Sequence, residues 1–312
     1  MLRRAYNYNT ESIPHLAGAD PNMFKKLKTF VNAFGINWLA KTFLDRLPFH
    51  LKGILFQYVV NKAGLEIGGP TSLFRSRRIT DVYSIVKSID NVNFAVNTLW
   101  NNGSYDSQNF FYGEKVGKEI ISEASDLSCI EDQTYDFCIS SHVLEHLSNP
   151  LKAIFEMKRV IKAGGHIIII APHKDITFDH NRKITSVQHM IDDFKNNVQE
   201  GDLSHLDMNE IIDNYDYSMD SGISTKEEFI ERCGNNRTNR ALHQHVFTTE
   251  IILKLADYAN LKIVCVKPRL SYGIMVVATK LENYMANGDW NSKFLSPDAG
   301  WRIESPFLSD KI

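Results

Sequence analysis

The fold is decided by residues 135–172, which read YDFCISSHVLEHLSNPLKAIFEMKRVIKAGGHIIIIAP. Residues 135–140 have the composition of a strand, and residues 143–160 follow at once with a helical pattern. After a glycine turn, residues 166–171 form an apolar run that is typical of a central parallel strand. A helix between two such strands predicts an α/β protein with a parallel, doubly wound sheet.

The same alternation continues on both sides of this stretch. Upstream, three further strands are expected, and the residues from Asp20 to Lys62 before them have helical spacing. Downstream, a helix and two strands are expected to close the sheet as a terminal antiparallel hairpin. The upstream strands are predicted at residues 64–68, 83–89 and 119–124, the downstream helix at residues 249–260, and the hairpin strands at residues 261–267 and 273–280.

The regular pattern lapses between His173 and Phe247, where the chain is polar and only partly helical. A connection this long inside a compact domain usually has a function, for example as a lid. We therefore expect an N-terminal helical cap over residues 1–62 and a core over residues 63–280. Within the core, residues 173–247 are expected to form a substrate-side insertion, and residues 281–312 to form a C-terminal tail.

Composition and charge limit the expected binding partners and the expected cellular compartment. The 312 residues carry a formal net charge of −2 and no aromatic-interleaved basic face, so nucleic acid is not an expected partner. The residues up to Lys62 are basic, which leaves peripheral contact with an acidic membrane surface open. No uninterrupted apolar stretch is long enough to span a bilayer. The four cysteines are scattered without paired spacing, which fits a reducing, cytoplasmic location.

Residues 65–70 read Leu-Glu-Ile-Gly-Gly-Pro and end the first expected strand in glycines. Such an end lets the chain turn tightly and lets a ligand approach the backbone. Ser72 and Leu73 stand where a dinucleotide motif has its third glycine, which disfavours a nicotinamide-dependent oxidoreductase. Asp90 follows the second expected strand, where a carboxylate is able to accept hydrogen bonds from ribose hydroxyls. A solvated turn aspartate fits the same spacing.

Residues 135–172 resemble the corresponding region of the class I S-adenosylmethionine-dependent methyltransferases. Members of that family usually carry an aspartate-bearing strand, the sequence HVLEH, the sequence RVLKPGG and an apolar strand that ends in proline. The matching residues here are Asp136, residues 142–146, residues 159–165 and Pro172; residues 65–69 match the first motif of the family, and Glu123-Ala124 matches its acid–alanine pair. The resemblance covers residues 64–172 and resumes at residues 249–280.

This resemblance implies a Rossmann-like, mostly parallel sheet of strand order 3-2-1-4-5-7-6, with S-adenosylmethionine as the cofactor. It also implies four groups of contacts, to the methionine and sulfonium end, to the ribose, to the adenine and along the pocket wall. The residues implied are, in that order, Glu66, Gly68, Gly69 and Pro70; Asp90; Glu123 and Ala124; and Ser141 and His142.

The implied activity is methyl transfer, and the available histidines favour an oxygen of a small-molecule or sugar-type acceptor. The sulfonium already makes its methyl group electrophilic, so a base is needed only for a poorly acidic hydroxyl. His173, directly after the fifth expected strand, and His180 are the candidates for that base, or else loop residues with local hydrogen bonds. A further group before the last expected helix suits an anionic part of the acceptor or a solvated lid surface; it comprises Arg237, Arg240, His243 and His245.

The motif His142-x-x-Glu145-His146 supports a rival hypothesis. On a helix, residues i and i+4 share a face, so the two histidines would be able to bind zinc beside Glu145, as in a metal-dependent hydrolase. The motif is also similar to the E-x-x-E-H of small-RNA 3′-end methyltransferases, although His142 replaces the first glutamate. We predict instead that no metal is bound and that Glu145 and His146 cap and pack a helix start. A non-catalytic binding protein of the same fold is the remaining alternative.

Overall fold

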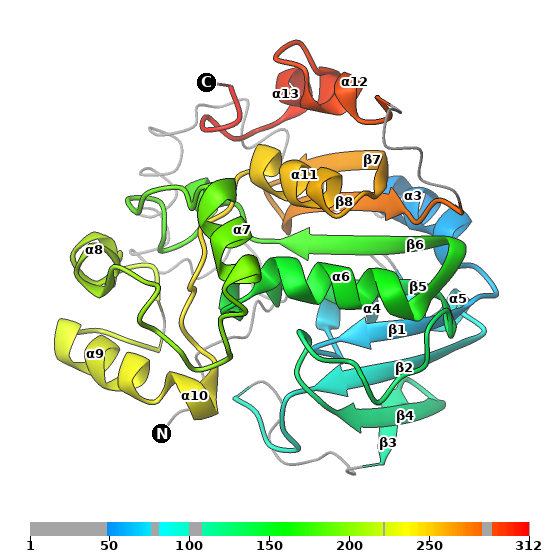
Figure 1. Ribbon diagram of the computed structural model, residues 1–312, viewed down its shortest axis with the longest axis horizontal. Coiled ribbons are helices and arrows are strands. Elements are labelled where there is room, and N and C mark those ends of the chain that lie inside the picture. Colours follow the sequence, from blue (N-terminus) through cyan, green and yellow to red (C-terminus); the bar gives the residue numbers. More distant parts are fainter. Residues whose placement is uncertain (1–48, 76–80, 100–107, 221, 283–288, 312) are drawn as a thin grey trace, which may run out of the picture.

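The computed structural model describes residues 49–75, 81–99, 108–220, 222–282 and 289–311 (Figure 1). Most of the expected N-terminal helical segment lies outside the described residues, and only its last helix, α3 (Phe49–Val59), lies within them. All four cysteines lie within the described residues and are free thiols.

One sheet of eight strands organises the protein, in the order β3-β4-β2-β1-β5-β6-β8-β7. The strands are β1 (Ala63–Ile67), β2 (Ser88–Asn93), β3 (Asn109–Tyr112), β4 (Lys115–Ile121), β5 (Tyr135–Ser141), β6 (Ile161–Ala171), β7 (Lys262–Arg269) and β8 (Gly273–Thr279). From β4 to β6 the neighbours are parallel, whereas β8 runs antiparallel to both β6 and β7. The predicted order 3-2-1-4-5-7-6 is confirmed, with β3 added at one edge in antiparallel pairing with β4.

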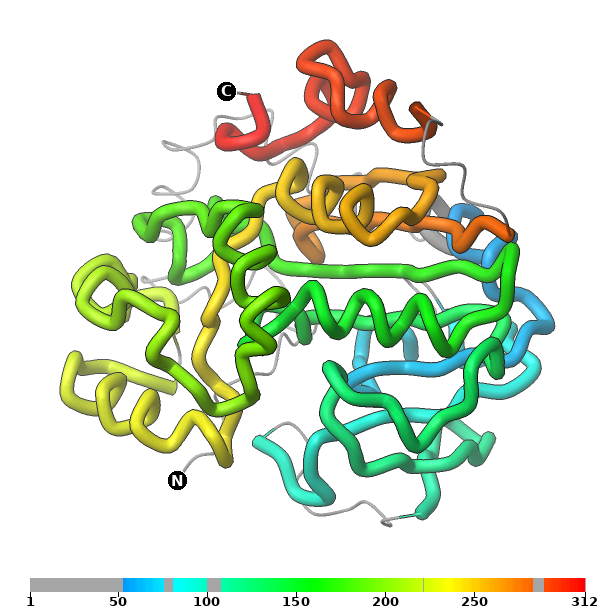
Figure 2. The backbone as a smooth tube through the Cα atoms, in the orientation of Figure 1, coloured from blue at the N-terminus to red at the C-terminus, as the bar shows by residue number. Residues whose placement is uncertain are grey.

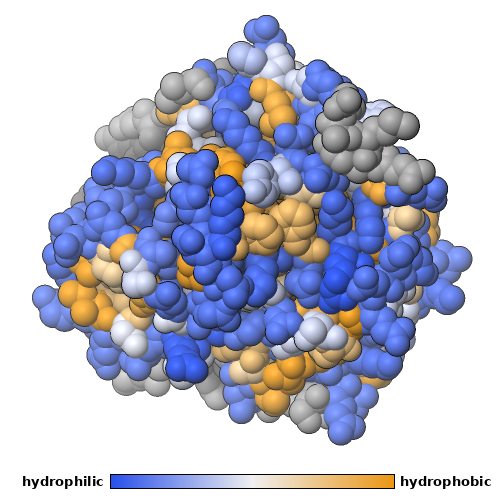
Figure 3. All heavy atoms as spheres, viewed as in Figure 1, coloured by the Kyte–Doolittle hydropathy of each residue, from blue (hydrophilic) through white to orange (hydrophobic). Residues whose placement is uncertain are grey.

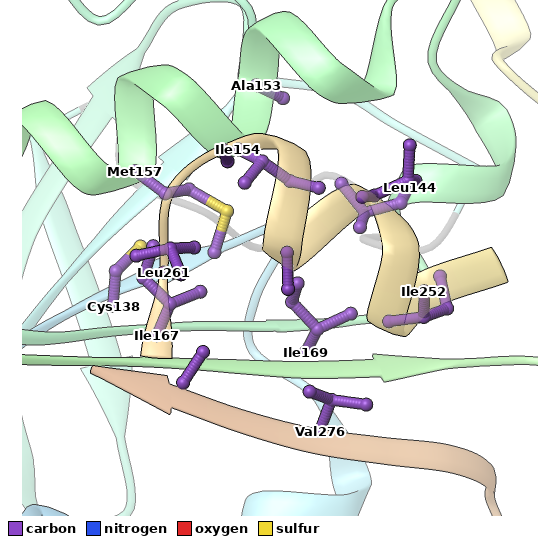
Figure 4. Close-up of a cluster of buried hydrophobic side chains, with 14 of the residues drawn as sticks. Cys138, Leu144, Ala153, Ile154, Met157, Ile167, Ile169, Ile252, Leu261 and Val276 are labelled. Atoms are coloured by element: carbon purple, nitrogen blue, oxygen red, sulfur yellow. The ribbon is translucent and has the colours of Figure 1, made fainter. Parts of the chain in front are cut away.

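Helices cover both faces of the sheet, because β6 is apolar on both sides. Ile167 and Ile169 pack with α6 and α11 on one face, and Ile168 and Ile170 pack with α3 and α5 on the other. Figure 4 shows the first of these layers, where Ile154 and Met157 of α6 and Ile252 of α11 meet the strand. The helices are α4 (Ser72–Arg75), α5 (Val82–Ile85), η1 (Leu144–His146), α6 (Pro150–Val160), η2 (Lys174–Ile176), α7 (Val187–Lys195), α8 (Met208–Asn214), α9 (Lys226–Gly234), α10 (Asn236–Asn239), α11 (Thr249–Tyr258), α12 (Ser292–Leu295) and α13 (Gly300–Glu304).

Two predicted elements differ from the structure. The strand expected at residues 83–89 is a short helix, α5, followed by β2, because Val82, Tyr83 and Val86 bury their side chains on one side of a single turn. The helix expected at residues 143–160 is broken into η1 and α6, since Asn149 caps α6 by accepting the Lys152 N–H at 3.0 Å. Proline then occupies the first turn of α6, where its missing N–H costs nothing.

The insertion at residues 173–247 carries α7 to α10 and a small core of its own. That core comprises Phe178, Ile211, Tyr215, Ile223, Phe229, Cys233 and Leu242. Phe194 of α7 stacks on Phe155 of α6 with ring centroids 4.9 Å apart, which joins the lobe to the main domain. Figures 1 and 2 show the lobe beside the carboxyl ends of the parallel strands, so it lies where a ligand of this sheet would bind.

None of the described helices is both long enough and apolar enough to cross a membrane. The face viewed in Figure 3 is mostly hydrophilic, with apolar side chains gathered in small groups. Beyond the sheet, the C-terminal residues pack back onto the domain, with Trp301 and Phe307 buried.

Candidate active site

The site lies where the sheet order reverses. From β1 the chain moves outward to β2 and β4, and then crosses back to β5 on the other side of β1. In open α/β sheets a crevice forms at the carboxyl ends of the strands at such a point, and ligands bind there. The Gly68–Gly69 turn leaves β1 at this position, with β2 and β5 on its two sides.

The glycine turn needs glycine at both positions. Gly68 has a φ of +79°, which L side chains rarely adopt, and a Cβ there would lie 2.6 Å from Cγ2 of Val143. A Cβ on Gly69 would lie 2.3 Å from the carboxyl carbon of Glu66. The Gly68 N–H donates to the Val92 carbonyl at 2.8 Å, so the turn is held against the end of β2. The backbone therefore borders the crevice without side chains that would fill it.

Glu66 supports this turn from beneath. Its side chain is 1% exposed and accepts hydrogen bonds from the Tyr83 hydroxyl at 2.7 Å and from the Thr71 N–H at 3.1 Å. Burial raises the pKa of Glu66 to about 8, although both hydrogen bonds act in the opposite direction. The side chain is thus placed to shape the turn that the sequence analysis assigned to the methionine end.

Asp90 does not reach the crevice. It pairs with Leu65 inside β2, three residues before the strand ends, and its carboxylate accepts from the Tyr135 hydroxyl and the Lys118 N–H, each at 2.8 Å. Successive side chains of a strand alternate between its faces, so Asp90 lies on the face opposite Asn91 and Asn93. The strand-end position that the sequence analysis gave to Asp90 is held by Asn93.

A buried polar network joins the ends of β1, β2 and β4. The Asn91 amide accepts the Gly69 N–H at 2.8 Å and donates to the Gly69 carbonyl at 3.2 Å. Asn93 also donates to the Gly69 carbonyl, and both asparagines donate to the Glu119 carboxylate at 2.8–2.9 Å. Burial raises the pKa of Glu119. Sequence analysis missed these residues, although the Asp-Asn-Val-Asn run of β2 already puts both asparagines on one face.

Glu123 and Ala124 follow β4, as the acid–alanine pair requires. Ala124 is buried in the main core, and Glu123 Oε1 lies 2.6 Å from Nη2 of Arg240 in the insertion. The other guanidinium nitrogen of Arg240 lies 2.6 Å from Oε2 of Glu200, and the group stands over the Phe94 ring at 5.0 Å. Arg240 therefore ties the insertion to the main domain across this side of the crevice.

The opposite side of the crevice is formed where β5 ends. The Ser140 and Ser141 hydroxyls are buried and have no hydrogen-bond partner. His142 follows with a φ of +55°, and its side chain remains 31% exposed. The Gly68–Gly69 turn follows β1, which pairs with β5, so these unpartnered hydroxyls lie on the neighbouring strand. Such groups fit a ligand that brings its own polar groups, as S-adenosylmethionine does.

The comparisons with known proteins agree with this geometry. Residues 82–169, from α5 into β6, match the family model described as a methyltransferase domain. This match covers less than a third of the chain. It agrees with the resemblance of the β1, β5 and β6 motifs to class I S-adenosylmethionine-dependent methyltransferases.

The individual proteins that this chain resembles are distant or match it only in part. An uncharacterized protein of Methanocaldococcus jannaschii is 49% identical over 57 residues, which are 18% of this chain and 27% of that protein. The match thus spans about a quarter of the length of that curated relative. A solved S-adenosylmethionine-dependent methyltransferase from Aquifex aeolicus is 15% identical, with a TM-score of 0.40 over 84% of this chain and 100% of that one. A possible histamine N-methyltransferase from Thermotoga maritima is 14% identical, with a TM-score of 0.38 over 83% of this chain and 100% of that one.

The two histidines predicted as candidate bases lie in different surroundings. His173 is fully buried and stacks on Phe307 with ring centroids 3.8 Å apart, while Nε2 lies 3.1 Å from Asp310 and Nδ1 accepts the Asp175 N–H. Both ring nitrogens are occupied, and the ring anchors the C-terminal segment. His180 in the insertion is 34% exposed, with Nδ1 3.1 Å from the Thr177 carbonyl oxygen.

Proposed function

We propose that this methyltransferase transfers the methyl group of S-adenosylmethionine to an oxygen of a small-molecule or sugar-type acceptor. The observation that carries the proposal is the Gly68–Gly69 turn at the sheet reversal, opposite the buried, unpartnered hydroxyl of Ser141. The bound cofactor supplies an electrophilic methyl group on a sulfonium. The protein therefore has to hold the cofactor and the acceptor, orient them toward each other and exclude water.

The cofactor contacts divide among the ends of β1, β2, β4 and β5. The Gly68–Gly69 backbone, on its Glu66 support, receives the methionine end, and Asn93 takes the place of the usual ribose carboxylate at the end of β2. Glu123 and Ala124 border the adenine, where Arg240 holds the Glu123 side chain. Ser141 and His142 complete the wall on the side of β5.

The acceptor enters from the side of the insertion, which excludes water from the crevice. Of the histidines at this edge, His142 suits proton removal best, because its ring is partly exposed and its Nδ1 lies 3.6 Å from the buried Glu145 carboxylate. That carboxylate stabilises the imidazolium formed when the ring accepts a proton from a hydroxyl. His180 is the second candidate, and His173 is assigned to holding the C-terminal segment.

The test is transfer of label from methyl-¹³C S-adenosylmethionine into a whole-cell extract, which is separated by size after the reaction. We expect the label in the small-molecule fraction, at the carbon chemical shift of an O-methyl group. Label that accumulates on protein or nucleic acid contradicts the acceptor class, and label at an N-methyl or C-methyl shift contradicts the oxygen assignment. Label that stays on the cofactor at saturating extract, while the cofactor is bound, favours the non-catalytic binding protein.

A further inference from the structure

A second cluster of chemically capable side chains lies beside the crevice. Glu145 and His146 come from η1, just after β5, and His243 comes from the segment that leads out of the insertion into α11. One ligand atom from each of the three lies within 4.8 Å of the others, and all three side chains are buried. His243 lies far along the chain from Glu145 and His146, so tertiary folding is what brings the three side chains together.

Glu145 is the unusual member of this cluster. Its side chain is 1% exposed, and neither carboxylate oxygen has a hydrogen-bond partner. The nearest groups to Oε1 are imidazole nitrogens, His142 Nδ1 at 3.6 Å and His146 Nε2 at 3.7 Å, which is too long for a direct hydrogen bond. Burying a carboxylate in this way is costly unless a cation balances it.

The two buried histidines are oriented by their other nitrogen. His243 Nδ1 lies 2.6 Å from Oδ2 of Asp179, and Asp179 is itself held by Arg182 at 2.7 Å. His146 Nδ1 lies 3.2 Å from the Leu242 carbonyl oxygen. In metal sites, each histidine ligand donates its second N–H to a carboxylate or a carbonyl, which fixes the ring and directs the remaining nitrogen at the ion. This cluster has both kinds of partner.

We propose that Glu145, His146 and His243 bind one divalent transition-metal ion of the zinc type. Two imidazoles and a carboxylate suit such ions, and three protein ligands leave a coordination position for an exogenous oxygen. His142 stands at the more exposed side of the cluster, toward the crevice. If the proposed methyl transfer is correct, the open position takes an acceptor oxygen and lowers its pKa. The metal site itself does not depend on that reaction.

The described residues hold another group with ligand-type side chains, which serves as a comparison. There the Asp193 carboxylate lies 3.2 Å from His189 Nε2 and 3.3 Å from His205 Nδ1. These contacts are shorter than those of Glu145 with its two imidazoles. The two groups also differ in that both carboxylate oxygens of Glu145 lack a hydrogen-bond partner, whereas only Oδ2 of Asp193 does.

The experiment is titration of the full-length, chelator-stripped protein with Co²⁺ alone, read by visible d–d absorption, followed by displacement with Zn²⁺. We expect one ion per chain with tetrahedral or five-coordinate absorption. Glu145→Gln and His243→Gln are each expected to weaken Co²⁺ binding on the order of 100-fold, and Asp179→Asn by about tenfold or more. The matched control, His189→Gln, is expected to leave affinity and spectrum unchanged.

Three results would overturn the metal site. One is no Co²⁺ or Zn²⁺ binding by folded wild-type protein; another is binding that Glu145→Gln leaves intact; the third is binding that His189→Gln abolishes. Glu145→Gln is isosteric and removes a buried charge, so it is expected to fold even if a histidine variant does not. S-adenosylhomocysteine binding, measured on the same wild-type sample, separates the two proposals. Wild-type protein that binds Co²⁺ but not S-adenosylhomocysteine counts against the proposed function. Wild-type protein that binds S-adenosylhomocysteine but not Co²⁺ counts against the metal site.

Discussion

His142 and His173 leave neighbouring strands at the same edge of the sheet, yet their rings lie in different surroundings. His142 keeps 31% of its side chain exposed beside the crevice, whereas His173 is sealed under Phe307 and held by Asp310. Proton transfer to an acceptor needs contact with that acceptor or with one bridging water. On this basis we propose that the first ring takes part in the chemistry and that the second serves packing.

Separate substitutions of these two histidines test that assignment. His142→Asn is expected to lower kcat on the order of 100-fold, with S-adenosylhomocysteine affinity nearly unchanged. His173→Gln is expected to lower the unfolding temperature by several degrees and to leave kcat within about threefold. Steady-state kinetics and thermal unfolding measure both. A His173 variant that is stable but inactive contradicts the assignment.

Glu66 makes the stability of the domain depend on pH. The folded protein holds the Glu66 proton up to about pH 8, whereas the unfolded chain releases it near its ordinary pKa of 4.5. The folded state therefore binds more protons across this window, and the contribution of Glu66 to stability is lost as pH rises from 4.5 to 8. Glu66→Gln is expected to flatten this part of the stability profile by on the order of a few kcal/mol. Urea unfolding at several pH values measures it, with exposed Glu231→Gln as the control; equal slopes for all three proteins refute the prediction.

At the scale of elements, Asn149 separates η1 from α6 and fixes where the helix begins. Its side-chain oxygen caps α6 at the Lys152 N–H, and its amide nitrogen donates to the Asp193 carbonyl at the end of α7. One side chain thus sets both the start of α6 and the docking of the insertion. The break also keeps Glu145 and His146 in a separate turn, in which Glu145 is directed into the buried cluster.

Asn149→Ala is therefore expected to destabilise the protein by about 1–2 kcal/mol, because a helix cap and a tertiary hydrogen bond are both lost. Asn149→Ser keeps a cap acceptor without adding a charge and loses the donation to Asp193, so it is expected to cost less than Asn149→Ala. Chemical denaturation of the two variants measures which is the more stable. The account of this break fails if the serine variant is the less stable one.

At the scale of the whole molecule, the insertion and the tail are joined to the sheet by charged contacts. Arg240 links Glu123 to Glu200, and Asp310 accepts from Thr249 and Ser305 while it holds His173. These contacts hold the insertion and the tail at the edge where the parallel strands end. Coverage of the crevice therefore depends on a small number of ion pairs between segments far apart in the chain.

Arg240→Ala is expected to loosen that coverage. It leaves Glu200 buried without its cation, so the insertion is expected to open more often and to be cut faster by protease within residues 173–247. The dissociation constant for S-adenosylhomocysteine is expected to rise about tenfold, mainly through a faster off-rate. Limited proteolysis and stopped-flow binding measure the two effects. Lys226→Ala, at an exposed ion pair of the same lobe, is the control and is expected to change neither.

The sequence allowed the sheet order to be predicted, because strand burial and helix periodicity are local patterns. The apolar run in β6, for example, is buried on both faces as its composition requires. The end of β2 was placed at Asp90, whereas the strand extends to Asn93, since its end is set by pairing with β1 and β4 rather than by local sequence. The contacts of His243 with Asp179 and of Arg240 with Glu123 join distant segments, and single-residue patterns carry no signal for them.

The central claim is that the crevice at the Gly68–Gly69 turn holds S-adenosylmethionine, with Asn93 at the ribose. Calorimetric titration of ligand-free protein with S-adenosylhomocysteine tests it most directly, using wild type, Asn93→Ala and Asp90→Asn. We predict one site of micromolar affinity, weakened about tenfold or more by Asn93→Ala and unchanged by Asp90→Asn. Folded wild-type protein that does not bind, or binding that is weakened by Asp90→Asn and not by Asn93→Ala, would contradict the account.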